Sequence, residues 1–420
     1  MATPLPIDQS WYRQVLLAAA LVGLLVAALG LVYLGVSGAA FEGIFGEPRL
    51  DAWSGEWWWI GVTAAGGFLV AGLRKWWKTT DKVPGGVAII ESGKVDYKVA
   101  PSWVALALVS AVAGASLGPS FALVMMGGGL AAWVASRRWV GNEDARLYST
   151  LAGIAGGFGG AFTSPMLGSL VVSELAPVPK QKYVDALLPQ LIGAVVAFGL
   201  FFGVVGSTLL NSFAIPAPEF TTWLLVMGVG LGVASSVVMI VFIAIVKIVT
   251  VAGAKLSHSL IRGVVGGALV GLLAVALPLT IGSGNNQLSA VIDNAPAIGA
   301  GLLLAVLVGK MLAMALSLQA GFIGGNVLPM LFVGGTAGAI VHILVPGIPY
   351  AIAVAAMLAA VPGAVIKAPI GLVLIAALSV GLGPVTTAPV AIAVVTSYLL
   401  TAGFAALLRA KRQEVPAVDV

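Results

Sequence analysis

Cysteine is absent from the 420 residues, and histidine occurs only twice. The first absence excludes disulfides, thiol catalysis and thiolate metal sites. Charged side chains are also scarce: they form 9% of the chain, whereas a soluble domain carries about 25%. Hydrophobic residues make up 60%, and the mean hydropathy is +1.08. This composition excludes a soluble globular protein and predicts a multi-pass membrane protein.

Long apolar segments recur along the whole chain. A helix needs about 20 apolar residues to cross the hydrocarbon core. Segments without a break lie at 15–36, 57–73, 188–213, 221–248, 262–281, 294–319 and 387–408. Four more segments contain breaks: 101–135 at a Gly-Pro-Ser corner, 148–175 at Pro165, 322–345 at glycines, and 349–381 at Pro362 and Pro369. Non-helical backbone is tolerated at membrane depth only where protein or water surrounds it, so the breaks indicate an interior site.

The charges predict the topology. The loop at 41–56 carries four acidic residues against Arg49, whereas clusters of lysine and arginine follow residues 73 and 136 and recur near 180, 250 and 410. By the positive-inside rule, the basic loops are cytoplasmic and the 41–56 loop is outside. The net charge of +5 is thus a topology signal, and no nucleic-acid partner is expected. The run at 15–36 is longer than a signal-peptide core, so it is interpreted as a retained transmembrane helix.

Internal repetition divides the chain into related halves. Gly118 and Pro165 are 47 residues apart, and Gly325 and Pro369 are 44 apart. Broken helices at matching positions of two halves are typical of transporter folds with a site at the interface. The sequence therefore predicts one transmembrane domain over 1–420, with inverted halves at about 11–215 and 216–408. Since 12 residues follow residue 408, no C-terminal soluble domain is expected.

Two of the breaks predict an anion site. "SLGPSF" at 116–121 and "GFIGGNVL" at 321–328 each begin an apolar helix with glycines. A helix N-terminus offers unpaired N–H donors and partial positive charge, and glycine lets a ligand approach the backbone. The alternative is that small residues only allow close helix packing, which is the interpretation for the unbroken "GVGLGVASS" at 228–236.

Five motifs in order resemble the CLC family of chloride channels and exchangers. "SLGPSFALVMMG" is similar to the family's S-L-G-R-E-G-P-S-V-Q-I-G segment, and "GFIGGNVLPMLF" to its G-G-x-F-x-P helix start. The other three motifs lie in 151–175, 266–287 and 365–374. The resemblance covers about residues 15 to 408. It implies an all-α fold of two inverted halves with broken and re-entrant helices, and a homodimer with a separate pore in each subunit.

The resemblance also implies the anion-binding residues, with backbone N–H groups as the main ligands. The implied residues form two runs: Gly118, Pro119, Ser120 and Phe121, then Gly324, Gly325, Asn326, Val327 and Leu328.

Several family positions are changed. The gating glutamate falls at Ser120, or at Leu117 in the other register, so neither register supplies a carboxylate. The filter phenylalanine corresponds to Val327, and no tyrosine lies near Pro384, where the filter tyrosine would fall. A glutamate pair at the inner side is replaced by Glu174 and Leu175.

The hydroxyl of Ser120 is interpreted either as a helix cap or as an anion contact.

Four charged residues are candidates for pore electrostatics. Asp81 and Lys82, in "TDKVPGG", are expected near the inner mouth, where the family has its serine motif. Lys310, inside an apolar run, is interpreted as a fixed positive charge beside the pore or as a lysine that extends to the membrane surface. Glu174 lies near a broken helix end and is interpreted either as a functional charge inside the membrane or as a side chain that extends to the membrane surface.

These observations predict passive, uncoupled conduction of chloride or a similar small anion through a CLC-type pore in a bacterial inner membrane. The alternatives are proton-coupled anion exchange along a rewired proton path, and a divergent transporter of another solute. No metal, cofactor or enzymatic activity is expected, since no metal cluster, catalytic triad or nucleotide loop is recognisable.

Overall fold

The structure is a computed structural model that describes residues 6–79, 83–162, 164–206, 213, 215–216 and 218–413. Within these ranges the chain is all-helical. The α-helices are α1 (Ser10–Phe45), α2 (Trp59–Trp76), α3 (Gly86–Ser92), α4 (Ala100–Val112), α5 (Ser120–Arg138), α6 (Glu143–Ala161), α7 (Pro165–Leu175), α8 (Tyr183–Val205), α9 (Trp223–Ala254), α10 (Ser259–Ala276), α11 (Asn285–Ala320), α12 (Val327–Leu344), α13 (Tyr350–Gly363), α14 (Pro369–Val380) and α15 (Ala388–Gln413).

Short 3₁₀ helices connect some of these elements, at Pro6–Asp8, Lys180–Lys182, Pro278–Thr280 and Val385–Thr387. Eight helical segments of the described chain are long and apolar enough to cross a membrane. Four shorter apolar helices, α4, α7, α13 and α14, have between 11 and 14 residues. A helix this short cannot span about 30 Å of hydrocarbon, so at least one of its ends lies at membrane depth.

The predicted breaks are present, with one correction. The 101–135 segment divides into α4 and α5, and α7 and α14 begin at Pro165 and Pro369, where a missing N–H costs nothing. Pro362 was expected to break the 349–381 segment, but it is the second-last residue of α13. The break lies at 364–368 instead, because Pro369 disfavours helical backbone in the residue before it.

Helix α11 differs from its predicted bounds of 294–319. It begins nine residues earlier, at Asn285, and contains a kink at Gly299, where φ is 78°. Pro296 lies inside the same stretch and cannot donate a backbone hydrogen bond, which loosens the helix there. The kink separates an amide-rich first part from the long apolar second part.

Glycine contacts hold the helices close together. A Cβ on Gly127 of α5 would lie 2.0 Å from the carbonyl oxygen of Gly153 of α6, and one on Gly67 of α2 would lie 2.0 Å from that of Gly263 of α10. Between membrane helices, where water supplies little driving force, such close packing is a main source of stability. Gly228 and Gly232 of α9 contact α15 in the same way, which confirms the packing interpretation of that segment.

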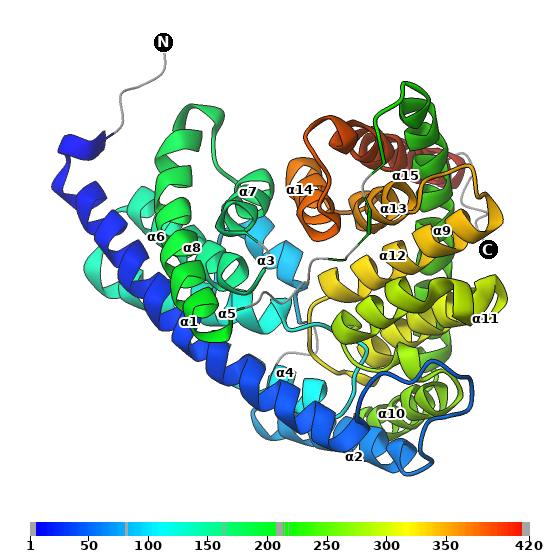
Figure 1. The fold of residues 1–420 in the computed structure, drawn as a ribbon. Helices are drawn as coiled ribbons and strands as arrows, with labels where there is room; N and C mark the ends of the chain where they lie inside the picture. The colour runs from blue at the N-terminus through cyan, green and yellow to red at the C-terminus, as the bar shows by residue number, and fades with distance from the viewer. Residues whose placement is uncertain are drawn as a thin grey trace.

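Helices of the two predicted halves lie side by side. Figure 1 shows α1, α6 and α8 on one side and α9, α11 and α12 on the other, with α7 facing α14 across the middle. The first half is not wholly separate, because α2 packs along α10 of the second half. The starts of α5 and α12 point toward the boundary between the two groups, which is where the candidate site lies.

Candidate functional site

Two glycines join the predicted helix starts directly. The N–H of Gly118 donates to the carbonyl oxygen of Gly325 at 2.6 Å, and the N–H of Gly325 donates to that of Gly118 at 2.7 Å. They form an isolated antiparallel bridge. The two segments therefore converge as predicted, but each of these two N–H groups donates to the carbonyl oxygen of the other glycine. The expectation that both would be ligands is corrected, since each already has a carbonyl acceptor.

Two serines strengthen this junction with reciprocal hydrogen bonds. Ser317 of α11 accepts the N–H of Ser116 at 3.0 Å, and Ser110 of α4 accepts the N–H of Ile323 at 3.0 Å. Each serine precedes the bridging glycine of its own half by eight residues. The pattern S-x-x-A-G-x-x-x-G thus occurs at 110–118 and again at 317–325, 207 residues later. This repeat was readable from the sequence, but sequence reasoning missed both serines.

The glycine inside each repeat turns the chain out of its helix. Gly114 has a φ of 80° and Gly321 a φ of 90°, which is the left-handed region that glycine adopts without steric cost. Each lies four residues after the serine. The helix ends just before this glycine, and the backbone that follows runs without helical structure to the bridge.

A central cavity lies beside the bridge, with a volume of about 220 Å³. The starts of α3, α5 and α12, the strip before α14, and side chains of α6, α7 and α14 form its wall. The lining residues are Gly85, Gly86, Val87, Ile90, Ser120, Val124, Phe158, Val171, Leu175, Gly324, Gly325, Asn326, Val327, Met330, Val365, Ile366, Ala368, Leu372 and Ile375. None of these described residues is ionisable, so the wall combines apolar side chains with polar backbone and a few neutral donors.

Ser120 and Asn326 supply the polar side chains of this cavity. Ser120 is the first residue of α5, and its hydroxyl makes no hydrogen bond within the described chain. The N-cap of α5 is Pro119 instead, so the cap interpretation of Ser120 is wrong. The carbonyl oxygen of the Asn326 amide is buried without a described partner, while the amide NH₂ of asparagine is a donor.

Further donors come from the first turns of the two helices. The first i→i−4 hydrogen bonds run from Leu123 to Pro119 and from Met330 to Asn326. The N–H groups of 120–122 and 327–328 come before these bonds and have no partner of that kind. They also carry the positive end of each helix dipole. The arrangement can hold an anion without a buried cation.

The other predicted anion ligands have different surroundings. Pro119 lines a separate cavity beside the end of α1, which we call the outer cavity. Phe121 is 1% exposed and packs against Trp103, with ring centroids 6.0 Å apart. Leu328 is also buried, and its Cβ would lie 3.2 Å from a Cβ added to Gly118. The side chains of Phe121 and Leu328 are therefore packing residues, and only their backbone can face the site.

Lys310 lies outside both cavities. It is fully buried, so the interpretation as a lysine that extends to the membrane surface is wrong. Its ammonium donates to the carbonyl oxygens of Thr280 at 3.1 Å and Gly282 at 2.7 Å, and lies 5.1 Å from the ring centroid of Phe332 on α12. Lys310 thereby fixes the loop before α11 against α12. Its side-chain nitrogen lies within the protein, on the carbonyl oxygen of the residue just before Ser283 of the outer cavity wall.

Glu174 joins the two halves. One of its carboxylate oxygens accepts the N–H of Ile370 at 2.9 Å, and the other accepts the N–H of Gly371 at 2.8 Å. These donors belong to the first turn of α14, where a negative charge also favours the helix dipole. Glu174 is thus a cap of α14, and it is absent from the central cavity wall. The other two candidates, Asp81 and Lys82, lie outside the described residues.

The outer cavity contains functional candidates that sequence reasoning missed. Its volume is also about 220 Å³, and it is lined by Leu34, Ser37, Gly38, Phe41, Glu42, Ala111, Leu117, Pro119, Ser283, Asn285, Asn286 and Gln287. The signal was the polar run "GSGNNQ" at 282–287, whose hydroxyl and amides face the end of α1. Glu42, which is exposed, is the only carboxylate among the described lining residues. The two cavities share no described lining residue: Leu117 and Pro119 face this one, whereas Ser120 and Gly325 face the central one.

The fold and site define a class of membrane protein in which opposed helix starts meet at a shared cavity. A family model described as "Voltage gated chloride channel" matches residues 66–402. The chain therefore belongs to this family, the CLC family, as the motifs predicted. The family membership and the apolar helices confirm the predicted location in a bacterial cell membrane as a multi-pass protein.

Three similar proteins show the range within the family. The chain is 29% identical over 258 residues to a "Chloride/fluoride channel protein" of Pseudomonas syringae pv. tomato, covering 58% of this chain and 54% of the relative. It is 27% identical over 274 residues to the "H(+)/Cl(-) exchange transporter ClcA" of Vibrio cholerae, covering 63% and 53%. Both matches span about half the length of the relative. A structure of "a slow cyanobacterial Cl-/H+ antiporter" superposes with a TM-score of 0.79 at 19% identity, covering 95% of this chain and 98% of that one, which confirms the predicted fold.

Proposed function

We propose that this protein conducts chloride or a similarly small anion passively through the central cavity, without coupling to protons and without catalysing a reaction. The observation that carries the proposal is Ser120 at the start of α5, with a hydroxyl free to donate into a cavity whose described lining has no ionisable side chain. The anion would be held by this hydroxyl, by the amide of Asn326 and by the first N–H groups of α5 and α12.

The same observation argues against proton coupling. An exchanger must bind and release a proton on a group that the anion pathway also reaches. A serine hydroxyl does not titrate near neutral pH, and Leu175 lines the cavity where a second acidic residue would be needed. Glu174 is occupied by two N–H groups of α14. The described cavity therefore offers no proton acceptor.

Proton-coupled exchange is the second candidate. The names of the Vibrio cholerae relative and of the cyanobacterial structure both state exchange of chloride and protons. Glu42 in the outer cavity is a carboxylate that such a relay could use. Fluoride is an alternative cargo, because the name of the Pseudomonas syringae relative includes it.

Flux from proteoliposomes distinguishes these candidates. Purified protein is reconstituted with chloride inside, and efflux and internal pH are recorded together, with and without an imposed proton gradient. Passive conduction predicts chloride efflux that a proton gradient cannot drive uphill, with no proton movement once the membrane potential is clamped. Chloride-driven proton pumping would overturn the proposal and favour exchange. Replacing chloride by fluoride in the same assay identifies the preferred anion, and protein-free liposomes give the background leak.

We also propose that the protein is a homodimer with one pore per subunit. The segments 163–213 and 387–408 match the family's dimer-forming helices, and the apolar side chains of Met166, Val195 and Leu399 are exposed along them. The chain has no cysteine of its own. Two single-cysteine variants, Val195→Cys and Leu399→Cys, should therefore each give a crosslinked dimer in bilayers. If both cysteine variants yielded only monomer after crosslinking, the homodimer would be contradicted.

A further inference from the structure

A third cavity is strongly basic. It lies where the end of α2, the start of α10 and the end of α11 meet, and its volume is about 330 Å³. The lining residues are Ala71, Arg74, Lys75, Lys78, Thr79, Ser259, Arg262, Ala320 and Gly321. Four of them are cations, and no described lining residue is acidic. Three of these cations, Lys75, Lys78 and Arg262, have no ion-pair partner among the described residues, and the repulsion between them favours binding of an anion.

Close packing of α2 against α10 creates this cluster. Gly67 and Gly263 bring the two backbones into contact, so the cations at the end of α2 lie beside the first turn of α10. Arg74 also donates to the carbonyl oxygen of Gly321 at 3.1 Å, which connects α11 to the same wall. The fold therefore sets the backbone positions of the cations, with Arg74 and Arg262 partly buried and Lys75 and Lys78 exposed.

Two groups of hydrogen-bond donors at this cavity have no acceptor among the described residues. The Nε of Arg262 is buried and has no hydrogen-bond partner among the described residues. Helix α10 begins at Ser259 with no side-chain cap from His258, so its first N–H groups and dipole end are also available. A buried donor of this kind is normally satisfied. Guanidinium, ammonium, hydroxyl and helix N-terminus are together the recognised donors for phosphate.

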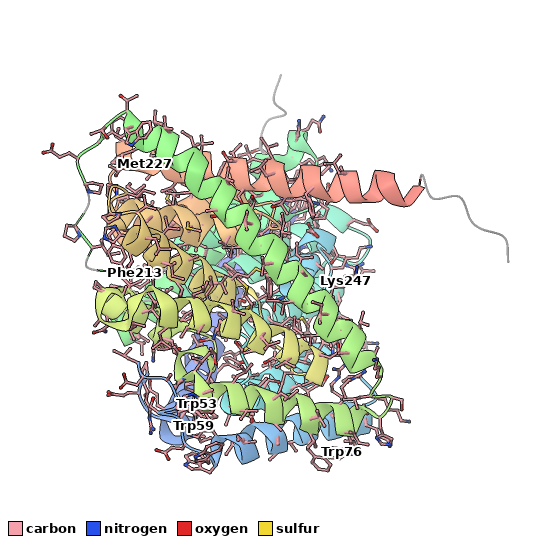
Figure 2. All side chains as sticks on the ribbon, turned by 90° about the vertical axis from the view of Figure 1, so that its right-hand side faces the viewer. Trp53, Trp59, Trp76, Phe213, Met227 and Lys247 are labelled. Atoms are coloured by element: carbon pink, nitrogen blue, oxygen red, sulfur yellow. The ribbon has the colours of Figure 1, made fainter. Side chains whose placement is uncertain are left out.

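We propose that this basic cavity binds a phosphate group, with Arg262, Lys75 and Lys78 as the main charged contacts. The site lies at the membrane surface, because the neighbouring Trp76 and Trp77 stack with centroids 6.3 Å apart and Trp76 is 74% exposed. Exposed tryptophans mark the headgroup level. Figure 2 shows Trp76 at the end of α2 opposite to Trp53 and Trp59. The phosphate can come from an anionic lipid headgroup or from inorganic phosphate in the cytoplasm.

Binding here would reach the anion pathway through the backbone. Gly321 is a wall residue of the basic cavity and also the first residue of the stretch that leads to Gly325 and its bridge. Phosphate bound in this cavity would lie beside Gly321, at the start of that stretch. Phosphate binding is thus placed to regulate flux, although the binding itself does not depend on which anion the central cavity conducts.

The test measures phosphate binding by the full chain in nanodiscs, independently of transport. In one arm, native mass spectrometry follows retention of phosphatidic acid against phosphatidylcholine. In the other, thermal unfolding is followed with inorganic phosphate against chloride at equal ionic strength. Retention or a raised unfolding temperature in either arm supports the site, and the arm that responds identifies the source. No preference in both arms would overturn the proposal.

Variants locate the binding. Arg262→Gln and the double variant Lys75→Gln/Lys78→Gln should each weaken phosphate binding about tenfold, as expected for loss of charge-assisted hydrogen bonds. The matched control is Arg137→Gln/Arg138→Gln at the end of α5, which removes two basic residues that do not line this cavity. If the control lost as much phosphate binding, the binding would reflect the overall positive charge of the surface, and the proposed site would be overturned. Unfolding temperatures without ligand verify that each variant is folded.

Discussion

The two glycine corners, 114–120 and 321–327, share a backbone and differ in their side chains. In both, a helix ends at a left-handed glycine, the N–H of the residue two positions later donates to a serine hydroxyl of the other half, and a second glycine forms the bridge. The next two residues are Pro119 and Ser120 in the first corner, and Asn326 and Val327 in the second. The repeated part builds the junction, and the unrepeated part determines the chemistry of the cavity.

The corners also differ in how tightly the glycine is enclosed. A Cβ on Gly325 would lie 1.8 Å from the hydroxyl oxygen of Ser120 and 2.9 Å from the backbone nitrogen of Phe121. A Cβ on Gly118 would lie 3.2 Å from the nearest atom, the Cβ of Leu328. The Ser120 hydroxyl of the first corner therefore fills the space that a side chain at Gly325 of the second corner would need. This asymmetry means that a side chain at position 325 would displace the Ser120 hydroxyl, whereas one at position 118 would not.

The largest expected effect comes from filling that space. Gly325→Val should reduce anion flux about tenfold, the effect of losing about 1.4 kcal/mol of anion binding, because the added atoms take the place of the Ser120 hydroxyl. Gly118→Ala, the matched change in the first corner, should leave most of the flux. Flux from proteoliposomes checks both, with size-exclusion chromatography to verify folding. Normal flux through folded Gly325→Val would place the site elsewhere.

A carboxylate at the first corner should have the next largest effect. Ser120→Glu is expected to slow anion flux severalfold at neutral pH, because its negative charge would occupy the position of the anion. Acidification should restore flux as the carboxylate gains a proton. Ser120→Gln has a similar volume and no charge, so its flux should not recover on acidification. Proton coupling should remain absent, since Leu175 provides no inner acceptor. Equal pH responses in the two variants would refute an electrostatic block.

Much of this architecture could be predicted from the sequence. Glycine and proline breaks in apolar segments predicted where helices start, because membrane depth restricts non-helical backbone to the interior. The roles of Glu174 and Lys310 could not be predicted, because their partners lie 196 and about 30 residues away and are backbone groups with no sequence signature. The bridge was missed for the same reason. The sequence predicts free N–H groups at a helix start, and only the fold shows that the N–H groups of Gly118 and Gly325 donate to each other's carbonyl oxygens.

The repeated serines should have smaller effects that are alike in the two halves. Ser317→Ala leaves the N–H of Ser116 without its acceptor, and Ser110→Ala does the same for Ile323. An unsatisfied buried N–H costs about 1–3 kcal/mol, so both variants should unfold at lower temperature and lose part of their flux. Thermal unfolding in detergent measures the first effect. Stability loss confined to one variant would show that the two corners are not equivalent supports.

The smallest expected effect is that of pH on the unmodified protein. With Ser120 at the first corner and no ionisable residue in the described lining of the central cavity, flux should vary less than about twofold between about pH 5 and pH 7.5. Glu42 is the one carboxylate of the outer cavity lining that is described, and it is exposed, so water and salt screen its charge. Glu42→Gln should accordingly change flux little at either pH. Flux recorded with the pH varied on one side at a time checks both statements. A steep response to external pH that Glu42→Gln removes would make Glu42 the outer titratable group. It would also move the control of this pathway from the glycine corners to the end of α1.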